Sequence, residues 1–200
     1  MTTSTLDPRT MQNLRTVFKY FNRVMLLHWH LGLGRLVNAW PAVMGRYMVI
    51  VHTGRKSGKR RYTPVNYAEV DGELYCTAGF GNISDWYKNM QIHPEIEVWL
   101  PDGWWSGVAE DITDSPDKYR LLKQVLIGSG FVAPLLGVDP HHLSEAQLLE
   151  IAKDYRLVQI RRVALRTGSD GPGKWVWAWP FVATALAMLA LRPHGRAEKR

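Results

Sequence analysis

From Tyr47 to Ala78 the chain reads YMVIVHTGRKSGKRRYTPVNYAEVDGELYCTA, a succession of short segments rich in β-branched and aromatic residues. Such segments favour strands, and Asp71-Gly72 between two of them is a typical hairpin turn. Further strands are expected at Glu95–Leu100, Trp104–Ile112 and Leu157–Leu165. Six or so short strands joined by hairpins, with helices at their periphery, predict a small antiparallel barrel or sandwich.

The chain divides into three parts around these strands. Its 200 residues fit one domain with appendages, and 46% hydrophobic against 22% charged residues exclude wholesale disorder. Residues 46–167 are expected to form the β domain. Residues 1–45 hold an amphipathic helix, Met11–Leu31, and a connector interrupted by glycines, and residues 168–200 hold a flexible linker and an apolar tail.

The net charge of +7 is unevenly spread along the chain. Residues 1–61 carry eleven basic and one acidic side chain, residues 62–154 carry five and fifteen, and residues 155–200 carry nine and two. Because a broad acidic surface repels a phosphate backbone, we expect no nucleic-acid partner. The single cysteine, Cys76, excludes an internal disulfide, and no metal site is expected from the spacing of the histidines and carboxylates.

The densest cluster of cations lies between the first two expected strands. In TGRKSGKRRYTP, Thr53–Pro64, five basic side chains occur within seven residues and surround Ser57 and Gly58. The two glycines allow backbone amides to turn inward and form an anion nest, and Arg and Lys add charge-assisted hydrogen bonds. The spacing is not that of a nucleotide-binding P-loop. A phosphate or polycarboxylate ligand is one interpretation of this loop, and a solvated basic turn is the other.

Two segments have the character of membrane-contacting helices. Trp175–Leu191 is a run of 17 uncharged residues between Lys174 and Arg192, and as a helix it would be ~25 Å long, short for a hydrocarbon core of ~30 Å. Membrane attachment, spanning or shallow, and packing on the domain or on a partner both stay open. Met11–Leu31 is a basic amphipathic helix that either covers the core or lies on an anionic leaflet. Since Met1–Pro8 lacks the features of a signal peptide, we expect a cytoplasmic protein, with membrane association through the C-terminal segment left open.

Four motifs carry a family resemblance. They are TGRKSGKRRYTP, the Asp-Gly hairpin, the glycine loop AGFGN and the segment SDWYKNMQIHPEIEV. Taken in this order, they resemble the deazaflavin-dependent nitroreductase and quinone reductase family of actinobacterial type, over about residues 47–112. The resemblance implies an FMN-binding-like split β-barrel with peripheral helices, an α+β fold that is mainly β. It also implies coenzyme F420 as cofactor, whose phosphate and oligoglutamate tail are anionic, and makes a homodimer plausible.

Carried over residue by residue, the resemblance implies three groups of cofactor contacts. The anionic tail and phosphate would meet Arg55, Lys56, Ser57, Gly58 and Arg61. The deazaflavin ring would lie along Thr63, Pro64 and Val65 and would approach the backbone closely at Ala78, Gly79 and Gly81. The family's helix beside the tail is matched by Trp86, Tyr87 and Asn89. Asn66 stands where the nitroimidazole-reducing branch has an aromatic residue, which argues against nitroimidazole activation.

The activity that the resemblance implies is hydride transfer from reduced F420 to an electron-poor, lipophilic acceptor, either a quinone or a nitro compound. Tyr67 is the candidate proton donor, with a plain strand residue as its alternative. Trp99, Trp104 and Trp105 either wall an acceptor pocket or, as we favour, pack in the core or against a partner. Two other classes stay open: a non-catalytic protein that binds or carries the deazaflavin or a fatty acid, and a split-barrel flavoprotein that uses FMN.

Overall fold

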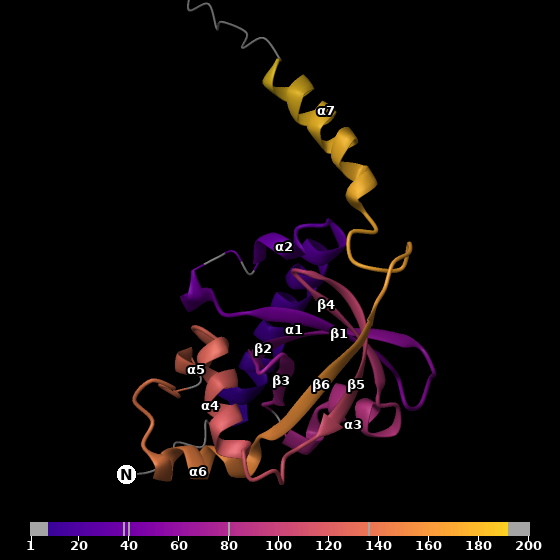
Figure 1. Ribbon diagram of the computed structural model, residues 1–200. Coiled ribbons are helices and arrows are strands. Elements are labelled where there is room, and N and C mark those ends of the chain that lie inside the picture. The colour runs from indigo at the N-terminus through magenta and orange to yellow at the C-terminus, as the bar shows by residue number, and fades with distance from the viewer. Residues whose placement is uncertain (1–7, 38, 40, 80, 136, 192–200) are drawn as a thin grey trace, which may run out of the picture.

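A computed structural model describes residues 8–191 apart from residues 38, 40, 80 and 136. Six antiparallel strands close into a barrel in the order β1-β2-β3-β6-β5-β4 (Figure 1). The strands are β1 (Tyr47–Thr53), β2 (Arg60–Val70), β3 (Glu73–Ala78), β4 (Glu95–Leu100), β5 (Gly103–Asp111) and β6 (Arg156–Leu165). The mainly β barrel is confirmed, and a sandwich is not formed because β1 pairs with both β2 and β4 and so closes the sheet.

Helices surround the barrel. They are α1 (Pro8–His30), α2 (Gly34–Val37), α3 (Asp85–Ile92), α4 (Lys118–Gly128), α5 (Val132–Leu135), α6 (Glu145–Asp154) and α7 (Trp179–Ala190), with 3-10 turns η1 (Ala42–Met44), η2 (Gly81–Ile83) and η3 (Val176–Ala178). Leu121 and Val125 of α4 pack against Ala68 and Tyr75 on the outside of β2 and β3. Helix α3 contacts β1 and β5.

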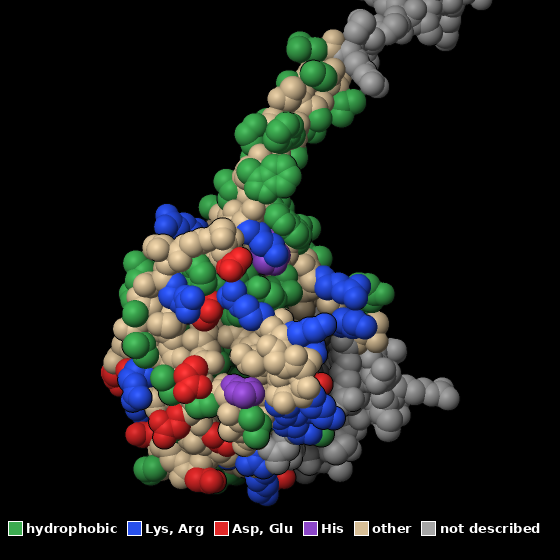
Figure 2. Space-filling view, turned by 90° about the vertical axis from the view of Figure 1, so that its right-hand side faces the viewer, with side chains coloured by type: hydrophobic (Ala, Val, Ile, Leu, Met, Phe, Trp, Pro, Cys, Tyr) green, Lys and Arg blue, Asp and Glu red, His purple; other side chains and the backbone are tan. Residues whose placement is uncertain are grey.

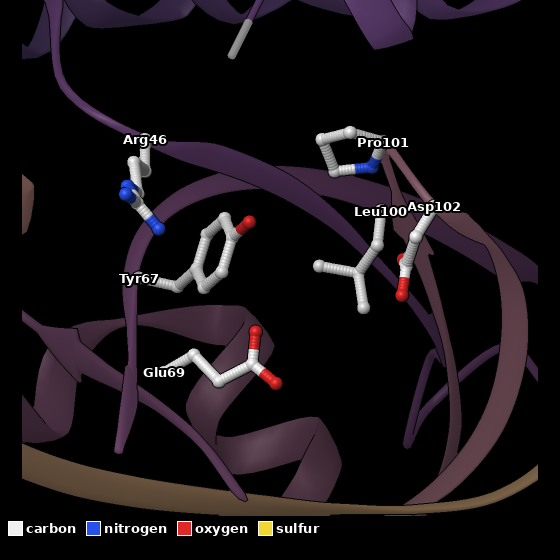
Figure 3. Close-up of a pocket in the computed structure, with 6 residues that line it drawn as sticks. All are labelled: Arg46, Tyr67, Glu69, Leu100, Pro101 and Asp102. Carbon is white, nitrogen blue, oxygen red and sulfur yellow. The ribbon is translucent and has the colours of Figure 1, made fainter. Parts of the chain in front are cut away.

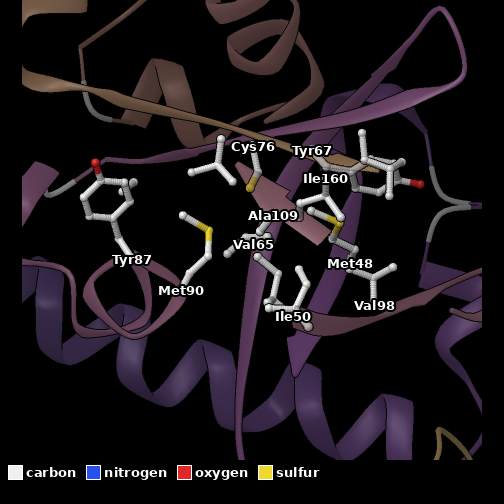
Figure 4. Packing of buried hydrophobic residues seen from close by; sticks show 14 of the residues in the cluster. Met48, Ile50, Val65, Tyr67, Cys76, Tyr87, Met90, Val98, Ala109 and Ile160 are labelled. Carbon is white, nitrogen blue, oxygen red and sulfur yellow. The ribbon is translucent and has the colours of Figure 1, made fainter. Parts of the chain in front are cut away.

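The alternation of side chains gives the barrel wall two apolar faces. Met48 and Ile50 of β1 point into the barrel together with Val65 of β2, as Figure 4 shows. Val49 and Val51 point outward and pack with three tryptophans, Trp29, Trp99 and Trp104. Because both of its faces are buried, β1 is a nearly continuous apolar run rather than an alternating one.

Helix α1 covers part of the outer wall with one of its faces. Met25 and Trp29 are buried, Met25 against Tyr47 and Trp29 against the outward side chains of β1. Val17 and Tyr20 on the other face are exposed. The apolar residues of this helix therefore form two stripes, and only one of them has a partner among the described residues.

Helix α7 projects away from the barrel (Figure 1). Its root is held by the end of α1, because the Trp175 N–H donates to His30 O at 2.8 Å and Trp179 Nε1 donates to Leu31 O at 2.9 Å. Beyond this root the side chains are exposed and apolar, with Phe181 70% exposed, and Figure 2 shows them along the projecting helix. Within residues 8–191, as far as they are described, no helix is both long and apolar enough to cross a membrane.

Candidate functional site

The loop between β1 and β2 folds back on itself. The Gly54 N–H donates to Lys59 O at 2.9 Å, and the N–H groups of Ser57 and Gly58 donate to Gly54 O at 3.1 and 2.8 Å. Gly58 has a φ of +63°, a left-handed conformation that glycine adopts without steric cost. The glycines thus form a compact turn that holds the cationic side chains at one end of the barrel.

Arg61 and Ser57 converge on Gly54. A Cβ at position 54 would lie 2.7 Å from Arg61 Nε and 2.8 Å from Ser57 Oγ, so a larger residue does not fit unless these groups move. A guanidinium and a hydroxyl therefore lie against one backbone position. Both groups donate hydrogen bonds to anionic oxygens, which is the chemistry that a phosphate or a carboxylate requires.

The cations of the loop fall into two classes. Arg55 and Arg60 are neutralised by carboxylates, Arg55 by Asp85 at 2.9 Å and Arg60 by Glu97 at 2.5 Å. The hydrogen bond from Arg55 lowers the pKa of the Asp85 carboxyl. A second group, Lys56, Lys59 and Arg61, is exposed and has no ion pair with any residue that the structure describes. Among the described residues, three positive charges without an ion pair thus remain close together in the loop and at the start of β2.

Asn89 of α3 connects this loop to the interior of the barrel. Its Oδ1 accepts hydrogen bonds from the backbone and the guanidinium of Arg55, at 3.1 and 2.9 Å. Its Nδ2 lies 3.2 Å from His52 Nδ1, and His52 Nε2 lies 3.1 Å from Thr63 Oγ1. Burial, with a contribution from Arg61, lowers the pKa of His52 to about 4, so the imidazole is neutral at pH 7. Sequence reasoning missed His52, because a single histidine in an apolar strand carries no motif.

The other two helix residues that the sequence singled out contact the interior cluster of the barrel. Tyr87 is buried, and its hydroxyl donates to Asp111 and accepts from Gln91 Nε2 at 3.1 Å. Burial and the Asp111 carboxylate raise the pKa of Tyr87 to about 12. Trp86 is half-buried and packs against the interior cluster. Of these three side chains, only that of Asn89 forms a hydrogen bond with the loop within the part of the chain that the structure describes.

The glycine segment after β3 lies toward the same end of the barrel as the loop. The pairing of Tyr67 with Cys76 runs β3 antiparallel to β2, so Ala78 lies about level with Val65 and the chain continues toward Thr63. The Ala78 side chain points into the core, and its backbone pairs with Arg156 of β6. Gly79 is exposed, and Gly81 has a φ of +55°. Pro64 is buried and pairs with Val49 of β1.

Tyr67 lies toward the opposite end of the barrel. Tyr67 lies four positions along the strand from Thr63, a distance of ~13 Å at ~3.3 Å per residue. Figure 4 shows Tyr67 at one end of the interior cluster and Tyr87 at the other. Tyr67 lines a cavity of about 290 Å³ together with Arg46, Glu69, Leu100, Pro101 and Asp102 (Figure 3). Burial raises the pKa of Tyr67. The structure therefore does not bring this residue together with the cationic loop.

The three central tryptophans do not form one wall. Trp99 and Trp104 are register partners on the outer face of the barrel, where α1 and the C-terminal linker bury them. Trp105 alternates to the inner face and packs against the interior cluster, with the Arg162 guanidinium 5.5 Å from its ring. Core packing thus accounts for all three.

The chain is similar to several known proteins. A family model described as F420H(2)-dependent quinone reductase matches residues 31–129 and confirms the resemblance carried by the sequence motifs. No curated protein matches the chain. Among solved structures, an F420-H2 dependent reductase is 21% identical and covers 57% of this chain and 92% of its own, with a TM-score of 0.43. A conserved hypothetical protein from Mycobacterium tuberculosis is 17% identical, covering 62% and 76%, with a TM-score of 0.41. A protein of unknown function from Agrobacterium tumefaciens is 19% identical, covering 84% and 71%, with a TM-score of 0.42.

Proposed function

We propose that this chain, whose residues 31–129 match the F420H2-dependent quinone reductases, reduces an electron-poor, lipophilic acceptor with F420H2. The observation that carries the proposal is the loop with three uncompensated cations, Lys56, Lys59 and Arg61, beside the Ser57 hydroxyl. When bound, the deazaflavin would supply the hydride. The acceptor would be a quinone or a nitro compound.

The described residues fit an anionic cofactor tail. Arg61 and the Ser57 hydroxyl would hold the phosphate, and Lys56 would meet the glutamates. Gly58 would only shape the turn, because its N–H already donates to Gly54 O. Arg55 would act indirectly, because its guanidinium is already engaged by Asp85 and Asn89. A tail with several negative charges matches three free cations better than the single phosphate of FMN does, which is why we favour F420 over FMN.

The remaining contacts of the proposal concern the ring. Thr63, Pro64 and Val65 would lie along its edge, and the small residues Ala78, Gly79 and Gly81 would admit it close to the backbone. These two segments lie toward the same end of the barrel as the loop. We assign Tyr67 no part in the transfer, since it lies toward the other end.

Parallel titrations test this proposal. The purified chain would be titrated with F420 and with FMN, following absorbance, and then supplied with F420H2 and a soluble quinone or a nitroarene. We expect F420 to bind more tightly than FMN and F420H2 to be oxidised in an enzyme-dependent manner. Tight binding without turnover on any acceptor would instead identify a deazaflavin carrier, and preference for FMN would refute the F420 assignment.

We further propose that α7 rests on a membrane surface, where a lipophilic acceptor would dissolve. The helix is apolar and exposed beyond its root, and Trp175 and Trp179 lie at that root, a position typical of interfacial aromatic side chains. The charge of Lys174 beside them suits an anionic leaflet.

Vesicle sedimentation tests the role of α7. The matched variants are F181S/L186S/L189S, which makes the helix polar, and L165S, which changes an exposed leucine on the barrel. We expect the triple variant alone to lose binding to anionic phospholipid vesicles. If it bound vesicles normally but changed the oligomeric state, α7 would be a contact between copies and not a membrane anchor.

A further inference from the structure

The hydrogen bonds of Asn89 fix the orientation of its amide. Both N–H donors that Arg55 directs at this side chain end on Oδ1, at 3.1 Å from the backbone and 2.9 Å from the guanidinium. An amide whose oxygen accepts two hydrogen bonds turns its NH2 group the other way. That group lies 3.2 Å from His52 Nδ1, so Asn89 donates to this ring nitrogen.

The donation from Asn89 determines which nitrogen of His52 carries the hydrogen. A ring nitrogen that accepts a hydrogen bond is unprotonated, and a neutral imidazole then bears its hydrogen on the other nitrogen. This is Nε2, which lies 3.1 Å from Thr63 Oγ1. The lowered pKa of His52, about 4 because of burial and Arg61, agrees with a neutral ring. His52 therefore donates to the Thr63 hydroxyl.

From this chain of contacts we infer that His52 is a positioning residue that makes the Thr63 hydroxyl a hydrogen-bond donor to the cofactor ring. A hydroxyl that accepts from His52 keeps its own hydrogen free for another acceptor. Thr63 is half-buried, on the same strand face as Val65 and toward the cationic loop. The inference rests on the proposed function in one respect, namely that the ligand beside Thr63 is F420.

The same chain of contacts couples the two halves of the proposed cofactor site. Asp85 and Asn89 of α3 hold Arg55 of the loop, and through His52 the same Asn89 orients Thr63 on β2. One helix thus fixes both the segment assigned to the anionic tail and the segment assigned to the ring. The set joins residues from β1, β2 and α3, and it is invisible in the linear order of the sequence.

The tautomer of His52 can be measured without any cofactor. Nitrogen-15 chemical shifts of the imidazole at pH 7 distinguish protonation at Nε2, at Nδ1 or at both positions. We expect hydrogen on Nε2 and none on Nδ1 in the full-length protein. Hydrogen on Nδ1, or a doubly protonated ring at this pH, would overturn the inference.

The coupling to the cofactor is tested by F420 dissociation constants of T63V, H52M and the double variant. Each single change is expected to weaken binding about tenfold, the usual effect of one hydrogen bond. The double variant should bind F420 no more weakly than the single variant with the lower affinity. Both changes remove the same hydrogen bond, the one that the Thr63 hydroxyl donates to the cofactor. Two conservative variants, T63S and H52Q, should bind within about threefold of wild type, because a hydroxyl and an N–H near the Nε2 position are retained.

Two failures can be told apart. If the wild-type protein does not bind F420, the proposed function is refuted, whatever tautomer the nitrogen shifts show. If the wild type binds F420 but the losses in T63V and H52M multiply in the double variant, the two side chains act independently. The proposed function then stands, and the role of His52 is refuted.

Discussion

Arg55 and Asn89 are joined by two hydrogen bonds to a single oxygen, one from the Arg55 backbone at 3.1 Å and one from its guanidinium at 2.9 Å. Arg55, for which the family resemblance implies a contact with the anionic tail, therefore also joins the β1–β2 loop to α3. The cations that form no ion pair with a described residue are its neighbours Lys56, Lys59 and Arg61. This division of labour within one basic motif leads to predictions that separate the two kinds of cation.

Replacing Arg61 should weaken F420 binding more than folding. Arg61 is exposed and has no ion pair with a described residue, so R61M removes a donor at little structural cost. We expect an F420 dissociation constant raised about tenfold, the effect of one charge-assisted hydrogen bond, and an unchanged melting temperature. R55M is the matched control and should lower the melting temperature, because it unties the loop from α3. Equal effects of the two changes on stability would contradict this assignment.

The glycines of the loop should differ in their tolerance of alanine. In G54A the new Cβ meets Arg61 Nε and Ser57 Oγ at under 3 Å, so both donors must move and F420 binding should fall about tenfold. In G58A the Cβ meets no atom within 4 Å, and only the positive φ costs stability, about 1 kcal/mol. Calorimetric titration and thermal unfolding of both variants check this. Normal F420 binding by G54A would exclude Gly54 from the anion site.

Stability should fall as the solution is acidified from pH 6.5 to pH 4. Burial lowers the pKa of both His30 and His52 to about 4, with contributions from Lys174 and Arg61 respectively. Between these pH values the two imidazoles bind protons in the unfolded chain but stay neutral in the folded chain. The free energy of unfolding therefore rises with pH across this window. Urea unfolding at several pH values measures the slope, and H52Q should reduce it. If the free energy of unfolding did not change from pH 6.5 to 4.5, these imidazoles would take up protons in the folded protein as readily as in the unfolded chain, and the prediction would be wrong.

Removing the hydroxyl of Tyr67 should leave F420 binding unaffected. The ring lines the cavity with Arg46 and Asp102 toward the end of the barrel away from the loop, and burial raises the pKa of the phenol. We expect Y67F to keep the F420 dissociation constant and the turnover number within about twofold of wild type, as for a substitution remote from the ligand. A turnover number reduced a hundredfold, with binding unchanged, would restore Tyr67 as the proton donor.

Much of the fold could be predicted because its signals are local. The strand segments, the Asp71-Gly72 turn and the cationic loop each depend on a few adjacent residues. The structure of the C-terminal run is harder to predict, because its composition is apolar throughout. It divides into the short turn η3 and the helix α7, which begins at Trp179 and has Pro180 in its first turn. The closure of the sheet depends on pairing between β1 and β4, which are distant in sequence.

The parts of the site that escaped prediction depend on register and docking. Thr63 is the register partner of Ile50, so both side chains lie on the inner face of the barrel. His52 lies two residues after Ile50 on β1 and therefore points to the same face, toward Thr63. The length of β2 carries Tyr67 away from the loop, and the alternation of side chains separates Trp105 from Trp104. Asn89 was singled out by family resemblance, but its link to His52 required the docked position of α3. A linear motif names such residues without showing which of them meet.

F420 binding to this chain is expected to depend above all on recognition of the anionic tail by the cationic loop. The direct measurement compares binding of F420 with that of its chromophore lacking the phosphate and the glutamates, for wild type and for the variant K56M/K59M/R61M. We predict that wild type binds complete F420 at least about tenfold more tightly than the chromophore, consistent with charge-assisted contacts, and that the variant loses this preference. Equal affinity of the wild-type protein for the two compounds would contradict the account.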